Sequence, residues 1–284
     1  MPTDPPTEEG VGMSRPMWFV KMLKIGFPYQ TGIARLTRVP LLGRLIERIM
    51  FEDDDIMILP REPVLRLDET VEPSEEMLLP ASVVEHFVEK ASFHWIMNTC
   101  ICRESMKCED YPIDLGCMFL GEAARDINPR LGRPVSKEEA LEHLERCREA
   151  GLYHLVGRNK LDSFWLNVHP GNRLLTICNC CTCCCLWRML PVVAPSVSTK
   201  LTRMPGVTVA VSDTCVGCGT CVEKSGCLVK AVQLSDGVAV ISEECRGCGR
   251  CAEVCPEGAI DVTVEDSDFV KRSIERIEAV VDVT

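Results

Sequence analysis

The chain has 284 residues and a formal net charge of −11, which opposes binding to the polyanionic backbone of a nucleic acid. This length allows two modest domains, and a hydrophobic fraction of 46% is ordinary for a globular protein. The exceptional figure is the 19 cysteines. The sequence starts MPTDPPTEEG, without the basic and apolar regions of a signal peptide, so we do not expect a secreted disulfide scaffold.

The cysteines occur in C-x-C, C-x2-C and C-C runs, which favour binding of metals or clusters over spaced disulfides. Because exposed clusters oxidise easily, we expect a reducing cytoplasm, in an anaerobic organism. No stretch of 18 uninterrupted apolar residues is present, so we expect no membrane span. An acidic redox protein is steered toward basic patches on redox partner proteins.

The first 60 residues divide into two parts. Residues 1–12 are rich in Pro, Thr, Asp, Glu and Gly, and we expect a disordered tail. Residues 13–60 form a basic arm, in which Lys and Arg side chains alternate with apolar ones and residues 13–50 contain the single acid Glu47. Such an amphipathic segment can cover the protein's own core, dock on a partner, or lie peripherally on the inner face of a membrane. The sequence leaves these three alternatives open.

Residues 61–190 are predicted to form a cysteine-rich, mainly helical domain. A helix is expected to start at Ser82, which forms an S-x-x-E capping box with Glu85, and a second to cover residues 136–151 with Ser136 as its cap. Two strand-like runs follow, GLYHLVGRN and FWLNVHPGNRLLTI. A helix before a two-stranded wing is a winged-helix outline, which leaves a redox-sensing regulator as one alternative. The acidity favours a scaffold use of that shape, with no nucleic acid bound.

This domain contains ten cysteines that ordinary core packing does not explain, in two groups. They are Cys100, Cys102, Cys108, Cys117, Cys178, Cys180, Cys181, Cys183, Cys184 and Cys185. Neighbouring side chains diverge, so one loop cannot offer all of them to one metal, and we expect some of the second group to join Cys100 and Cys102. The ten allow one or two further iron–sulfur clusters, or one cluster and a zinc ion. Cys147 lies on the apolar stripe of the second helix and is expected to be a free core thiol.

The C-terminal third begins with a predicted linker over residues 191–205. Residues 206–264 then repeat the order strand, cysteine loop, short helix and strand, with a hairpin turn at Asp236-Gly237. Residues 265–284 are expected to finish the chain as an amphipathic helix, over 267–281. The predicted fold class is therefore α+β.

Eight cysteines between residues 215 and 255 carry the strongest signal. Each half of this stretch starts C-x2-C-x2-C and supplies a fourth cysteine soon after. The x2 spacings let three successive thiolates reach three corners of one cubane, which predicts two [4Fe-4S] clusters. Structural zinc in the same residues is the alternative, but zinc does not require the strand-flanked repeat.

Residues 207–264 resemble the bacterial-type two-cluster ferredoxin domain. In that family the fourth cysteine of each run ligates the other cluster. The resemblance implies one cluster on Cys215, Cys218, Cys221 and Cys255, and the other on Cys245, Cys248, Cys251 and Cys227. The first run departs from the family, because five residues precede Cys227 where three are common.

Residues 80–264 also resemble a group of anaerobe iron–sulfur proteins that carry CxCR, GL.H and CNCCxCCC elements before a two-cluster ferredoxin module. The matching residues are 100–103, 151–154 and 178–185. The resemblance implies further clusters but no substrate. We therefore expect an electron carrier or redox subunit that passes single electrons between partners. The alternative is a reductase whose N-terminal cluster is catalytic and is fed by the ferredoxin module.

Overall fold

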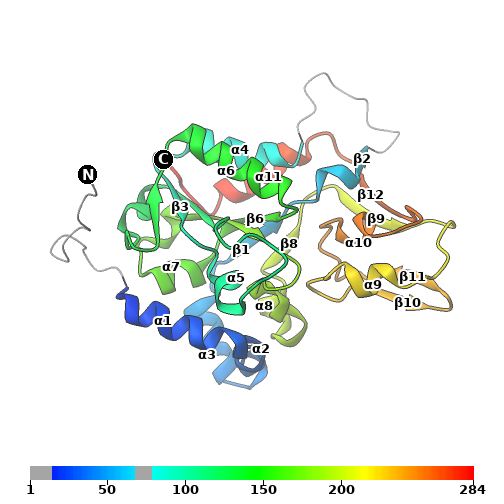
Figure 1. Ribbon diagram of the computed structural model, residues 1–284, viewed down its shortest axis with the longest axis horizontal. Helices are drawn as coiled ribbons and strands as arrows, with labels where there is room; N and C mark the ends of the chain where they lie inside the picture. The colour runs from blue at the N-terminus through cyan, green and yellow to red at the C-terminus, as the bar shows by residue number, and fades with distance from the viewer. Residues whose placement is uncertain (1–14, 68–78) are drawn as a thin grey trace.

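The computed structural model describes residues 15–67 and 79–284, and the expected tail over 1–12 lies outside them (Figure 1). Helices and strands are mixed, as the predicted α+β class requires. A seven-stranded sheet with helices on both faces forms the larger part, and the C-terminal cysteine motifs form a smaller module at one end (Figure 1). Within the described ranges, no helix is both long and apolar enough to cross a membrane.

The large sheet has the strand order β5-β3-β4-β7-β6-β1-β8. All neighbouring strands are antiparallel, except that β1 and β8 run parallel. The strands are β1 (Asp55–Ile58), β3 (His94–Met97), β4 (Met118–Leu120), β5 (Gly132–Pro134), β6 (Tyr153–Arg158), β7 (Leu175–Cys180) and β8 (Leu201–Arg203). Alternate side chains point to opposite faces, so each strand contributes to two separate cores.

One face of this sheet is covered by α4 (Ala81–Lys90), α6 (Lys137–Glu149) and α11 (Phe269–Glu278), which lie together in Figure 1. Phe87 and Leu144 are fully buried there. The helix expected over 267–281 is confirmed as α11, and its Phe269 and Ile277 lie in the core on this face, which also contains Val262 of the strand after the second cysteine motif.

The opposite face is covered by α7 (Lys160–Leu166) and by the basic arm, which contains α1 (Met17–Gly26), α2 (Gln30–Ala34) and α3 (Leu42–Met50). The short helices α5 (Ile101–Met106) and α8 (Pro195–Ser198) lie on the same side (Figure 1). Val20 of α1 is buried against the sheet. The arm therefore covers part of the protein's own core, which was one of the three alternatives.

The two predicted helix caps had different outcomes. The Ser136 hydroxyl accepts a hydrogen bond from the Glu139 amide, and the Glu139 carboxylate accepts one from the Ser136 amide, so this capping box is confirmed. The capping box at Ser82 is wrong. The helix starts one residue earlier, after Pro80, and the Glu62 carboxylate accepts from the Ala81 amide at 3.1 Å. A distant acid has taken the place of a local cap.

The two runs expected to form a wing lie in the large sheet as neighbouring strands β6 and β7. The start of the second run is helical, because residues 164–166 end α7. The segment 191–205, predicted to be a linker, contains α8 and β8, and β8 pairs with β1. The domain boundaries themselves stay predictions.

The smaller module holds a three-stranded sheet, a hairpin and two short helices. Its sheet has the order β2-β12-β9, where β9 is Val207–Val211, β12 is Ile260–Val264 and β2 is Leu65–Leu67 from the N-terminal part of the chain. The helices are α9 (Thr220–Lys224) and α10 (Arg250–Glu253). The predicted hairpin is confirmed as β10 (Val232–Ser235) and β11 (Val238–Ile241), with positive φ at Asp236 and Gly237.

Candidate metal and cluster sites

Eighteen of the 19 cysteines fall into four spatial sets, and we name each by its residues. The first ferredoxin set is Cys215, Cys218, Cys221 and Cys255, and the second is Cys227, Cys245, Cys248 and Cys251. The cavity thiols are Cys100, Cys102, Cys117, Cys178, Cys180 and Cys185. The four-thiol site is Cys108, Cys181, Cys183 and Cys184. The remaining cysteine, Cys147, is buried on α6, and burial raises the pKa of its thiol to about 12, as suits a neutral core residue.

The second ferredoxin set is the more deeply placed of the two. The pKa of both Cys248 and Cys251 is raised to about 12, chiefly by burial and then by neighbouring thiolates that include Cys227. Cys227 thus lies beside the cysteines of the second motif, although it follows the first in sequence. The Gly247 amide donates to Cys245 Sγ at 3.4 Å and the Ala231 amide to Cys227 Sγ at 3.3 Å. Such N–H groups stabilise negative charge on sulfur.

The first ferredoxin set lies nearer the surface. Cys218 is exposed, whereas Cys221 is buried and has a pKa raised by burial and then by the Cys255 thiolate. Cys255 therefore sits with the first motif and not with its own. The amides of Ala239 and Ala259 donate to Cys215 Sγ and Cys255 Sγ at 3.3 and 3.4 Å.

The cavity thiols come from three separate segments that meet on the arm side of the large sheet. Cys100 and Cys102 flank the start of α5, Cys117 precedes β4, and the other three lie at or just after the end of β7. Cys185 Sγ lies 3.2 Å from Cys180 Sγ. Hydrogen bonds also join Cys100 to Cys102, and Cys178 to both Cys117 and Cys180.

These thiols cannot all be anions together. Hydrogen bonds from Cys117 and Cys180 hold the pKa of Cys178 well below its usual value, while the same bonds raise the pKa of Cys117 and Cys180 far above it. Hydrogen bonding from Cys102 likewise lowers the pKa of Cys100 to about 7. A bound cationic centre removes this conflict, because metal binding releases the protons. The donor set fits an iron–sulfur centre, since soft thiolates are the ligands that such centres use.

The cavity thiols line a cavity of about 460 Å³ that is otherwise mainly apolar. The basic arm forms its other wall through Phe19, Met22 and Leu23 of α1 and through Ile46 and Met50 of α3. Lys24 of α1 forms an ion pair of 2.6 Å with Glu104 of α5, and Arg38 donates to the Val193 carbonyl at 3.0 Å. The arm is thus attached to the two segments that carry the cysteines.

Asp162 is a half-buried acid at the edge of the same cavity. It accepts hydrogen bonds from Trp165 Nε1 at 2.8 Å, Thr176 Oγ1 at 3.0 Å and Asn159 Nδ2 at 2.6 Å. Burial, and then the Cys178 thiolate, raise the pKa of Asp162 to about 7. Its charge is therefore sensitive to what the cavity thiols carry.

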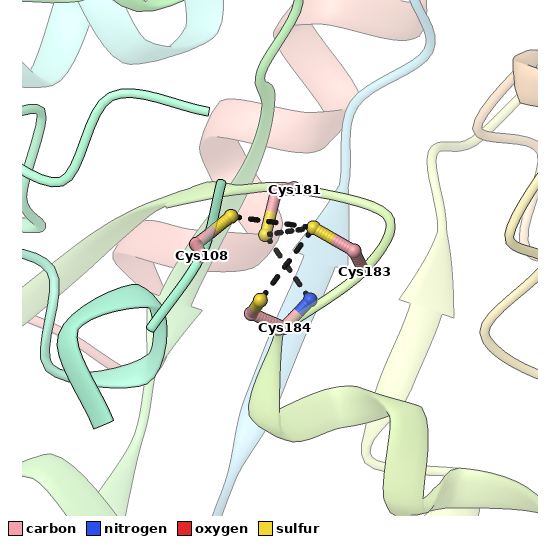
Figure 2. A group of neighbouring side chains, drawn as sticks. All are labelled: Cys108, Cys181, Cys183 and Cys184. Atoms are coloured by element: carbon pink, nitrogen blue, oxygen red, sulfur yellow. Dashed lines mark hydrogen bonds between the residues drawn. The ribbon is translucent and has the colours of Figure 1, made fainter. Parts of the chain in front are cut away.

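The four-thiol site is built from two loops. Cys108 follows α5, and Cys181, Cys183 and Cys184 lie on the loop after β7, with the four sulfurs turned toward one another (Figure 2). All four sulfur atoms lie within 4.8 Å of one another. The Cys184 amide donates to Cys181 Sγ at 3.3 Å. This arrangement is suited to holding one metal ion.

Arg103 lies between the cavity thiols and the four-thiol site. Its side chain is fully buried and donates to the main-chain carbonyls of Asn179, at 2.8 Å, and Leu115. Burial works to lower the pKa of its guanidinium, but thiolates from both groups, led by Cys100 and then Cys181, outweigh burial and raise it. A buried cation of this kind needs nearby negative charge, and here cysteines supply it.

The ferredoxin module and the cavity thiols share one buried core. Cys248 and Leu228 of the module pack into the cluster that contains Cys180, Cys185 and Tyr153. Tyr153 is buried and donates through its hydroxyl to the Cys181 carbonyl at 3.3 Å. The second ferredoxin set therefore adjoins the N-terminal cysteines through packed side chains.

Polar contacts hold the same junction. The Arg61 amide donates to the Cys248 carbonyl at 3.2 Å, and the Arg61 guanidinium pairs with Glu253 at 3.0 Å. Arg250 of α10 reaches the Gly151 carbonyl at 3.4 Å and the Tyr111 hydroxyl at 3.3 Å. The orientation of the module is therefore fixed by the N-terminal part of the chain.

The structure brings every predicted cysteine into one of these sets, and it divides the ten N-terminal ones six to four. Cys178, Cys180 and Cys185 join Cys100 and Cys102, whereas Cys183 and Cys184 do not, and Cys181 lines the cavity while its sulfur belongs to the four-thiol site. The assignment of all eighteen as ligands stays a prediction. Sequence reasoning missed Tyr153, Asp162 and Asn179, because a single aromatic or polar residue on a strand gives no signal of its partners.

Comparison with known families identifies one segment. Residues 238–261 match the 4Fe-4S binding domain, and this match includes Cys245, Cys248, Cys251 and Cys255. That part of the chain is a ferredoxin-type iron–sulfur domain. No curated protein and no solved structure matches the chain.

Proposed function

We propose that this chain is an iron–sulfur electron-transfer protein that passes single electrons between redox partners. Two [4Fe-4S] clusters would be held by the two ferredoxin sets, with the crossed fourth ligands Cys255 and Cys227, and a further cluster by the cavity thiols. The observation that carries the proposal is the shared core in which Cys248 packs with Cys180 and Cys185. Bound clusters of this kind take up and release one electron at a time.

The three cysteine sets are arranged from the surface inward. Cys218 of the first set is exposed and is flanked by Val216, which is 64% exposed, and Val222. The second set is covered by the junction with the N-terminal part, and Cys180 and Cys185 beyond it are buried. This order supports entry of electrons at the Cys218 end and movement toward the cavity thiols, or the reverse.

The chain's own residues would set how easily each site is reduced. Backbone amides donate to sulfur in both ferredoxin sets, and Arg246 and Arg250 place positive charge beside the second set. Both effects favour the more negative, reduced state of a bound centre. Arg103 would act in the same way for the cavity thiols.

We also propose that the acidic protein docks on basic patches of its redox partners in the cytoplasm, with no nucleic acid bound. The basic arm is the second contact surface. Trp18, Ile25, Tyr29 and Leu41 are between 61% and 78% exposed there, and cationic residues lie between them. Exposed apolar side chains among Lys and Arg suit a partner protein or an anionic membrane surface.

The test is the iron and acid-labile sulfide content of the full chain, purified without oxygen, together with EPR spectra over a range of potentials. Two cubanes give about eight iron atoms per chain, and a centre on the cavity thiols raises the total toward about twelve. Cys178→Ser should lose only the iron above eight, and Cys218→Ser should affect only the first ferredoxin set. A content near eight that Cys178→Ser leaves unchanged would overturn the N-terminal cluster.

The cavity supports a second candidate, a reductase in which the N-terminal centre is catalytic. A largely apolar space of about 460 Å³ beside the cavity thiols is the size of a small-ligand site. A small apolar ligand that alters the EPR signal lost in Cys178→Ser would favour the enzyme. A signal that responds only to potential would favour the carrier.

A further inference from the structure

Among the described residues, the four-thiol site is the cysteine group in which all four sulfurs lie within 4.8 Å of one another, whereas the cavity thiols make short contacts only in pairs. Cys183 Sγ lies 3.5 Å from Cys108 Sγ, 3.6 Å from Cys181 Sγ and 3.5 Å from Cys184 Sγ (Figure 2). Sulfurs joined in a disulfide lie about 2.0 Å apart, so none of these pairs is bonded. Four sulfurs around one ion, with metal–sulfur bonds of about 2.3 Å, lie about 3.8 Å apart.

A cubane does not fit these distances. Its four cysteines bind four different iron atoms, so their sulfurs stand farther apart than sulfurs that share one ion. We propose that Cys108, Cys181, Cys183 and Cys184 bind a single zinc ion in a closed tetrahedral site. Closed sites with four thiolates are the usual form of structural zinc.

The sequence around the site agrees with this assignment. Cys181 and Cys184 form a C-x2-C pair, a spacing common among zinc ligands. The amide of the second cysteine donates to the sulfur of the first. Arg188 donates to the carbonyls of Thr182 and Cys183, at 2.7 and 2.9 Å, and so holds the loop in its bent form. These hydrogen bonds fix the bend of the loop that carries three of the four ligands.

Two neighbours suit the charge and the burial of a zinc–thiolate complex. Four thiolates around one divalent ion leave a double negative charge, and the buried Arg103 interacts with Cys181. Cys181 and Cys184 are buried with Leu115, Leu152 and Cys147. Water is thus largely kept from two of the four ligands, as in a structural site rather than a catalytic one.

The site adjoins the cavity thiols, and Cys181 borders both. Cys178 and Cys180 line the cavity, while Asn179 between them bonds His154 and the Gly116 carbonyl at 2.8 Å each. Cys181 comes directly after the last residue of β7, and its sulfur is grouped with those of Cys108, Cys183 and Cys184. One run of cysteines can therefore supply two centres.

Zinc at this position would support the second ferredoxin set. A methyl group added to Gly226 would lie 2.6 Å from Thr182 Cβ, so the loop that carries Cys227 rests directly on the loop that carries the zinc ligands. Tyr111, beside Cys108, contacts Thr182 Oγ1 and Arg250. The two loops that the zinc ion joins thus support the five-residue segment before Cys227, which is longer than is common in ferredoxins.

The experiment measures zinc and iron on the full chain, purified without oxygen. We expect about one zinc per chain, lost in Cys183→Ser and in Cys108→Ser with most of the iron retained. Cys147→Ala is the matched control, because Cys147 is buried in the same cluster but is not a ligand, and it should keep the zinc. Iron in place of zinc, or loss of zinc in Cys147→Ala alone, would overturn the assignment.

Zinc-edge X-ray absorption of the unaltered chain gives a test that does not depend on whether a variant folds. We expect a first shell of sulfur only, at about 2.3 Å. Nitrogen or oxygen ligands, or a chain without zinc, would contradict the proposal. The assignment goes beyond the proposed function, because iron content and EPR test electron transfer independently of zinc.

Discussion

The two ferredoxin sets and the N-terminal cysteines are brought together by different routes. In the first ferredoxin set, three cysteines lie within seven residues, and glycines with positive φ at 217 and 219 bend the loop around them. In the cavity thiols, Cys100 and Cys102 meet Cys178 and Cys180 across more than 70 residues of sequence. The first route is local, and the second depends on the sheet.

Strand register is what assembles the cavity thiols. Met118 pairs with Ile177, which sets Cys117 beside Cys178, and Tyr153 pairs with Cys180 on the other side. A shift of one residue would turn these side chains to the opposite face. An N-terminal site should therefore lose its metal when the fold of the sheet is disturbed, whereas a ferredoxin site should lose its metal when its own loop is disturbed. The predictions below test this difference.

The largest effect is expected from Arg103→Met, which removes the buried cation that serves both N-terminal sets. Its loss leaves thiolates buried without a counter-charge, which costs about 3–5 kcal/mol in the free energy of unfolding. We expect anaerobic denaturant titration to show this loss, together with loss of N-terminal metal and retention of about eight iron atoms. Arg103→Lys keeps the positive charge and should recover part of the lost stability. Equal loss of iron from the ferredoxin sets would show that the two regions are not separable.

Much of the C-terminal module could be predicted because its signals are local. The x2 spacings, the Asp236-Gly237 turn and the amphipathic pattern of α11 each depend on residues close in sequence. The N-terminal cysteines could be counted and the divergence of neighbours foreseen. Their division six to four could not, because it follows from the order of the strands, which pairs β7 with both β4 and β6.

The failures have the same cause. Glu62 caps the start of α4 in place of Ser82, although Glu62 lies 19 residues before Ala81 in the sequence. Arg103 follows the C-x-C motif directly in sequence, but its complete burial between two thiol sets depends on β7 and on the loop before β4. Local pattern cannot report contacts that only tertiary structure creates.

A pair of glycines tests whether the first ferredoxin set depends on the backbone of its own loop. At Gly217, with φ of +67°, an added Cβ would lie 1.9 Å from the Gly237 carbonyl oxygen, whereas at Gly258, with φ of +59°, it would meet open space. Gly258→Ala should cost about 1–2 kcal/mol from backbone strain alone. Gly217→Ala adds a collision and should cost about 2–4 kcal/mol. We expect a chelator to remove iron faster from Gly217→Ala than from Gly258→Ala, with the zinc content of both unchanged. Equal rates of iron loss in the two variants would contradict the dependence of the first ferredoxin set on its own loop.

The N-terminal region should also show a pH dependence that its buried acids create. Asp54 accepts from the Lys160 amide at 2.6 Å, and burial raises its pKa to about 7 despite Lys200, Arg158 and Lys160 nearby. The folded protein then holds the proton more tightly than the unfolded chain does. Stability should fall as pH rises from about 4 to 7 and level off above, with about 2 kcal/mol lost between pH 5 and 7.

The matched variant is Asp54→Asn, which keeps an acceptor for the Lys160 amide and removes the titration. The difference between the unfolding free energies of the two proteins, measured at several pH values, isolates Asp54 from Asp162 and from the thiols. Between pH 5 and 7, we expect the free energy of unfolding of Asp54→Asn to increase relative to that of the unaltered protein. Parallel curves would mean that Asp54 is charged throughout and that burial at this point of the fold is incomplete.

The smallest effect is expected on the outer face of the basic arm. Ile25 is 74% exposed and Val20 is 1% exposed, although both lie on α1. Ile25→Ser should change the free energy of unfolding by less than about 0.5 kcal/mol, whereas Val20→Ala should cost on the order of 2 kcal/mol through loss of core packing. Comparable losses in both variants would mean that the outer face of α1 is also buried, in an assembly of this chain. A small loss at Ile25 leaves that face available for a partner while the inner face closes the cavity.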